Sequence, residues 1–180
     1  MFALFASLTV FATLLAQTTL FGPFALWGAR PDLCLIATVY FGLYWNLNRS
    51  LVVGAVLGLL QDTLGSGLVG TNLLTKAVFV FSLGLVQRHL RSTTWLTQLV
   101  VTSFLSLVDG VFFLGLTRTV SPATVGAAQA LPLLLLQIVV SGALAPVVIV
   151  GIERLRALFR LPSDLIGGLV RLRGAAAAPP

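Results

Sequence analysis

Apolar stretches close to twenty residues long recur along the chain, and they constrain its fold more than any other feature. A helix that crosses the ~30 Å hydrocarbon core of a bilayer needs about 20 mainly apolar residues. Six such stretches are present, with the third and fourth shorter and joined by a Gly-rich turn. They cover Phe2 to Phe21, Asp32 to Trp45, Leu51 to Leu64, Gly70 to Val86, Trp95 to Leu116 and Ala127 to Ile152. The sequence therefore predicts an all-α polytopic membrane protein, with about six transmembrane helices in one bundle over residues 1–152.

The composition excludes an ordinary soluble domain. Of the 180 residues, 58% are hydrophobic and 9% are charged, whereas a soluble domain carries ~25% charged residues. These few charged side chains cannot cover the outside of a soluble fold. Lipid must therefore surround most of the surface. The single cysteine, Cys34, cannot form an internal disulfide and is predicted to be a packing residue.

The distribution of cations predicts the orientation in the membrane. Arg30 and Arg118 fall on one side of the predicted helices, and Lys76 falls inside a helix. The other eight cations fall on the opposite side: Arg49, Arg88, Arg91, Arg154, Arg156, Arg160, Arg171 and Arg173. Cytoplasmic segments carry the excess of Lys and Arg, so we expect both termini to face the cytoplasm. The same placement explains the net charge of +6 without nucleic acid, and we expect no nucleic-acid binding.

The C-terminal segment, residues 153–180, is predicted to be a separate basic tail. It interleaves arginines with Leu and Phe and contains Pro162. Such a segment is typical of an amphipathic stretch at the membrane interface that is attracted to anionic lipid. Arg154, Arg156 and Arg160 are its candidate lipid-facing residues.

Four charged residues fall inside or at the ends of the predicted helices: Asp32, Asp62, Lys76 and Asp109. A charge at the centre of a bilayer costs ~2.5–3.5 kcal/mol on insertion scales, so each should face a partner or a wet cavity. The predicted topology places all four in the outer leaflet. We expect a polar cluster there, with Lys76 neutralising Asp62 across the short hairpin. Such a cluster either only holds helices together or binds a partner or ligand, and the sequence leaves both interpretations open.

Glycines and a proline supply candidate packing positions. Gly54 and Gly58 form a G-x-x-x-G step that permits close helix contact, inside the bundle or with another chain. Gly67 and Gly70 belong to a segment that matches G-x-G-x-x-G. That segment follows a membrane helix and not a strand, so it predicts a tight turn and not a dinucleotide site. Pro146 is predicted to kink the last helix.

No catalytic constellation is visible in the sequence. His89 lies between arginines in a predicted loop, with no His, Cys or carboxylate at ligand spacing. No nucleophile with an evident base and no phosphate-binding P-loop occurs. We therefore predict a protein that is not an enzyme and that needs no cofactor or metal.

Several short motifs, taken in order, resemble one known family. They are Arg30-Pro31-Asp32, Gly58-Leu59-Leu60-Gln61-Asp62 leading through Gly65 and Gly67 to Gly70, Leu107-Val108-Asp109, and Ser141-Gly142-Ala143-Leu144-Ala145-Pro146 before a basic terminus. Their order and spacing resemble the bacterial rod shape-determining family MreD. The resemblance covers nearly the whole chain.

The resemblance implies a non-enzymatic component of the bacterial inner membrane that serves cell elongation and lateral peptidoglycan synthesis. It implies the single-pass protein MreC as a direct partner. It also implies MreB, RodA and a class B penicillin-binding protein as direct or indirect partners. The family is similar in fold to the substrate-binding membrane subunits of energy-coupling-factor transporters. Self-association is left open.

Two functions from different classes follow. The first is a scaffold that binds MreC, and the second is a transport subunit whose outer cavity binds a small, vitamin-type solute. A transporter subunit needs a roomy pocket with several aromatic and hydrogen-bonding groups. The predicted outer loops offer few of these groups, which favours the scaffold. An intramembrane enzyme is the weakest alternative.

Overall fold

The computed structural model describes residues 2–19, 31–65, 70–87, 94–120 and 127–159, without the side chains of 117, 118, 120 and 127–130. These residues form six α-helices and no strand. In chain order the helices are α1 (Phe2–Thr19), α2 (Leu33–Tyr44), α3 (Leu47–Leu64), α4 (Thr71–Val86), α5 (Trp95–Val120) and α6 (Ala127–Leu158). The all-helical fold class is therefore confirmed.

Three helices contain segments long and apolar enough to cross a membrane. These segments are Phe2–Thr19, Trp95–Leu116 and Leu131–Leu158, and the shorter apolar helices Leu33–Tyr44 and Thr71–Val86 accompany them. Large apolar side chains also point outward from α1, α3, α4, α5 and α6, among them Leu4, Val52, Val78, Phe104 and Val147. Lipid can solvate such a surface, whereas water would penalise it. The chain is a polytopic membrane protein.

Helix α2 occupies the centre of the bundle and contacts all five other helices. Eleven of its 12 residues are buried. At 1.5 Å per residue this helix is about 18 Å long, too short to cross the bilayer alone. Because α2 is enclosed by protein, its ends need not reach the lipid surface.

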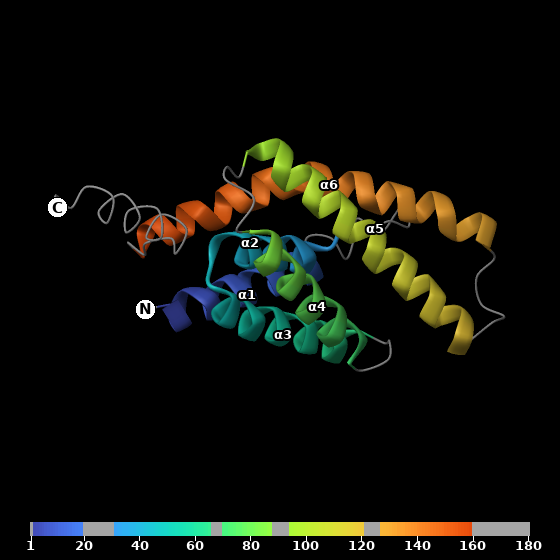
Figure 1. The fold of residues 1–180 in the computed structure, drawn as a ribbon, viewed down its shortest axis with the longest axis horizontal. Coiled ribbons are helices and arrows are strands. Elements are labelled where there is room, and N and C mark those ends of the chain that lie inside the picture. The colour runs from blue at the N-terminus through green and yellow to red at the C-terminus, as the bar shows by residue number, and fades with distance from the viewer. Residues whose placement is uncertain (1, 20–30, 66–69, 88–93, 121–126, 160–180) are drawn as a thin grey trace, which may run out of the picture.

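Four of the other helices pack against α2 as two hairpins (Figure 1). In one hairpin α3 packs along α4, and in the other α5 packs along α6. A Cβ atom added to Gly58 would lie 2.5 Å from the carbonyl oxygen of Asn72 and 2.6 Å from Cα of Leu73, and one on Gly54 would lie 2.7 Å from Cγ2 of Val80. The G-x-x-x-G step therefore serves contact between α3 and α4 within the chain.

Three helix ends differ from the prediction by several residues. Helix α5 continues to Val120, so Arg118 lies within it and not in a loop. Helix α3 begins at Leu47, so Arg49 lies in its first turn and not in a loop. Helix α6 continues to Leu158 and contains both Pro132 and Pro146. Beyond the predicted end, the Arg156 guanidinium lies 2.6 Å from Glu153 Oε2, an i,i+3 ion pair that suits a continuing helix.

Aromatic side chains gather where α1 begins and α6 ends, which is the same end of the bundle in Figure 1. Phe2 packs on Trp45 with ring centroids 4.7 Å apart, and Phe5 packs on Phe159 at 6.2 Å. The Arg49 guanidinium carbon lies 5.1 Å from the centroid of the Phe2 ring. We call this the aromatic end. The opposite end, where α2 and α4 begin, is the polar end.

Candidate polar site

Asp32 connects three helices at the polar end. Its Oδ1 accepts a hydrogen bond of 2.9 Å from the backbone N–H of Leu35, so the side chain caps the N-terminus of α2. Its Oδ2 accepts a bond of 3.3 Å from Gln61 Nε2 in α3. The same oxygen lies 3.5 Å from Lys76 Nζ in α4. One buried carboxylate therefore joins α2, α3 and α4.

Lys76 is completely buried, and its carboxylate partner differs from the predicted one. Its ammonium pairs with Asp32 and donates a hydrogen bond of 3.4 Å to Asn72 Oδ1. The expected pairing of Lys76 with Asp62 is therefore wrong. Proximity along the α3–α4 hairpin suggested Asp62, but α2 passes through the centre and brings Asp32 closer to the ammonium.

Asp62 instead binds the N-terminus of α4. Its oxygens accept bonds from the backbone N–H groups of Gly70 (2.9 Å), Asn72 (3.1 Å) and Leu73 (3.1 Å), and from Asn72 Nδ2 (2.9 Å). The first N–H groups of a helix have no partner within the helix, and its positive dipole end favours an anion. Gly70 has φ 101°, which a residue with a Cβ adopts only under strain. Asp62 and Gly70 together fix the turn into α4.

Asp109 lies on α5 and lines a cavity of about 400 Å³ at the polar end. Its carboxylate interacts electrostatically with Lys76 and Asp32. Residues from all six helices or their caps line this cavity. The polar members are Gln17, Asp32, Gln61, Asn72, Asp109 and Gln137, and the apolar ones include Phe113, Leu114, Leu133 and Leu134. We call it the polar cavity.

The structure thus brings the four predicted charged residues to one end of the bundle. Asp32 and Lys76 form an ion pair, Asp109 lines the same cavity as Asp32, and Asn72 links Asp62 to Lys76. The amides that complete this network were not among the predicted site residues. Gln17 Oε1, for example, accepts a bond of 3.1 Å from the backbone N–H of Cys34. Lone amides inside apolar stretches were the signal that could have identified them.

Some predicted positions do not belong to this site. Gly67 and Arg160 lie outside the described residues. Arg154 is exposed on the last turns of α6, and Arg156 pairs with Glu153 at the aromatic end. Pro146 lies within α6 between the two ends. The lipid-binding role of the basic tail stays a prediction.

The polar site is equipped for hydrogen bonding. Within the described ranges, no group of three or more His, Cys, Asp or Glu residues could hold a metal ion. The Gln61 Oε1 atom is buried and has no hydrogen-bond partner. A buried acceptor without a partner is costly. A donor from a bound group would remove that cost.

Comparison with known proteins identifies the family. The family model for the rod shape-determining protein MreD matches residues 1–153. Comparison with curated proteins and with solved structures gives no match, so the likeness to energy-coupling-factor subunits stays a prediction. The match covers most of the 180 residues, including every helix up to the last turns of α6. The chain belongs to the MreD family of rod shape-determining proteins.

Proposed function

We propose that this protein is a non-catalytic membrane scaffold in the rod-shape machinery, which binds MreC and supports lateral peptidoglycan synthesis. Family membership supports the role in rod shape. The polar cavity is the structural observation that supports the binding role. It brings together two carboxylates and four amides in a half-open cavity of a membrane protein, and one of these amides, Gln61, has an acceptor without a partner.

The polar groups of the cavity would hold a partner segment rich in hydrogen-bond donors. Around Lys76, the described side chains include the carboxylates of Asp32, Asp62 and Asp109. Two of these carboxylates are already held, by Lys76 and by the N-terminus of α4. Gln61, whose Oε1 has no hydrogen-bond partner, would then receive a donor from the partner segment.

We propose that the protein lies in the bacterial inner membrane with both termini in the cytoplasm. The polar cavity would then face outward. MreC would enter the cavity with the segment that adjoins its transmembrane helix. RodA and the class B penicillin-binding protein would bind this protein directly or through MreC. MreB would bind, directly or indirectly, on the cytoplasmic side. The tail of residues 153–180 would contact anionic lipid on the same side. Residues 1–152 would form the membrane bundle, and self-association remains compatible with this arrangement.

One observation favours a second function. A volume of about 400 Å³ lies within the ~300–1,000 Å³ typical of small-molecule sites. The sequence argument against a transporter considered only the outer loops, whereas the amides of this cavity lie inside the helices. The cavity could therefore serve the solute-binding subunit of a transporter. Phe113 is its one aromatic lining residue among those described, which is few for a vitamin-type solute.

Extraction of the tagged full-length protein in mild detergent, followed by mass spectrometry, tests the proposal. We expect MreC and cell-wall synthesis proteins to co-purify. Gln137→Leu should reduce the recovery of MreC, because it removes a polar group from the cavity wall. Val139→Leu is the matched control, because Val139 is exposed on the same helix and does not line the cavity. Recovery of a coupling subunit with ATPases, or of a retained solute, would overturn the scaffold proposal in favour of transport.

A further inference from the structure

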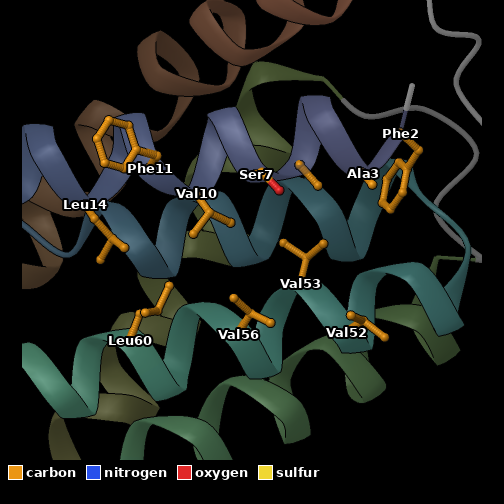
Figure 2. Close-up of a pocket in the computed structure, with 11 residues that line it drawn as sticks. Phe2, Ala3, Ser7, Val10, Phe11, Leu14, Val52, Val53, Val56 and Leu60 are labelled. Carbon is orange, nitrogen blue, oxygen red and sulfur yellow. The ribbon is translucent and has the colours of Figure 1, made fainter.

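A second cavity lies between α1 and α3. Its volume is about 480 Å³, and its lining is almost entirely apolar. Figure 2 shows Val10 and Leu14 on α1 and Val53 and Val56 on α3 directed into the space between the two helices. The full lining is Phe2, Ala3, Ala6, Ser7, Val10, Phe11, Leu14, Val52, Val53, Val56 and Leu60. We call it the α1–α3 groove.

The groove begins beside a cation. Phe2 lines its first part, and the Arg49 guanidinium lies over the Phe2 ring, 5.1 Å from the centroid. Val52 and Val53 follow Arg49 by three and four residues on α3, so all three share one helix face. Arg49 is exposed at this position and carries a guanidinium, a group that suits phosphate oxygens. The apolar groove therefore has a cation at one end.

The length of the groove matches one leaflet of a bilayer. From Phe2 to Leu14, twelve residues of α1 rise about 18 Å. This length is close to half of the ~30 Å hydrocarbon core. Apart from Ser7 the lining is apolar, and Arg49 lies at one end. An apolar groove of this length with a cation at its end suits the acyl chain of a lipid with a phosphate headgroup.

We propose that the α1–α3 groove is a binding site for an anionic phospholipid. One acyl chain lies between α1 and α3, and the phosphate binds the Arg49 guanidinium at the aromatic end. Under the predicted orientation this end faces the cytoplasmic leaflet, where anionic lipids are abundant. The bound lipid fills the space between two helices that contact each other only sparsely, and so holds α1 against the bundle.

Native mass spectrometry of the full-length protein in detergent tests this site, with phosphatidylglycerol and phosphatidylcholine added in parallel. Val56→Trp fills the groove from α3, and Ser7→Phe fills it from α1. If one of these variants fails to fold, the other still tests the site. Arg49→Gln removes the cation. Val78→Trp, on the exposed face of α4, is the matched control for the groove-filling variants.

We expect the wild type and Val78→Trp to retain phosphatidylglycerol. Arg49→Gln should weaken that binding about fivefold, the effect of one arginine beside anionic lipid. It should weaken the binding of phosphatidylcholine less, because the choline offsets the charge of the phosphate. The two groove-filling variants should lose both lipids. Wild-type lipid retention in both groove-filling variants would overturn the proposal, as would wild-type binding of phosphatidylglycerol by Arg49→Gln. Loss of MreC from Val56→Trp with lipid retention unchanged would also overturn it and assign the groove to a partner helix.

Discussion

Lys76 Nζ lies 3.5 Å from Asp32 Oδ2, and both side chains are buried where α4 meets the N-terminus of the central helix α2. The pair joins two segments that are 44 residues apart in the sequence. Because Asp32 also caps α2 and accepts from Gln61, this ion pair is part of a network that fixes three helices at the polar end.

The first prediction concerns the charge balance of this pair. Lys76→Met should lower the free energy of unfolding by roughly 3–5 kcal/mol, because it leaves a buried carboxylate without its cation. The double variant Asp32→Asn with Lys76→Met should recover much of that loss, since Asn still caps a helix. Cys34 is the single cysteine and is fully buried, so a thiol-reactive dye measures unfolding directly. A double variant no more stable than Lys76→Met would contradict the pairing.

The second prediction concerns the cap of α4. Asp62→Ala should cost roughly 2–4 kcal/mol, because several backbone N–H groups lose a charged acceptor. Asp62→Asn should cost less, since one side-chain oxygen remains. The neighbouring Thr63→Ala is the control, because Thr63 is exposed and bonds only to the backbone of Leu60 in the described structure. The same thiol-dye assay ranks the three variants, and equal stability of Asp62→Ala and Thr63→Ala would be inconsistent with the capping role.

The third prediction concerns the contact between α3 and α4. Gly58→Ala should destabilise the protein by about 1–3 kcal/mol, because the added methyl group meets the backbone of Asn72 and Leu73, which cannot move aside easily. Gly151→Ala is the matched control, because nothing lies within 4 Å of its added methyl group. Chemical-denaturant or thermal unfolding of the two variants should separate them clearly. Similar unfolding curves would mean that the helices are less closely packed than described here.

The sequence predicted the helices well because the bilayer imposes a length and a composition on each one. The predicted stretch Asp32 to Trp45, for example, differs from α2 by one residue at each end. The start of α3 was missed because Asn48 and Arg49 are typical of a loop, although an arginine at the membrane interface is compatible with a helix.

The arrangement of the helices could not be predicted in the same way. Helix α2 is apolar on every side, as are the lipid-facing helices, so its pattern gave no sign that it lies at the centre. The partner of Lys76 depends on that central position. The polar cavity also depends on Gln17, Gln61 and Asn72, which are single amides in separate helices and come together only in the fold.

The central claim is that MreC binds in the polar cavity, and site-specific photo-crosslinking in cells tests it most directly. A photoreactive residue replaces Leu133, which lines the cavity, or Val147, which is 69% exposed on the same helix but outside it. The account predicts a crosslink to MreC from position 133 that Gln137→Leu weakens, and none from position 147. No crosslink at 133, or equal crosslinking at both positions, would contradict it.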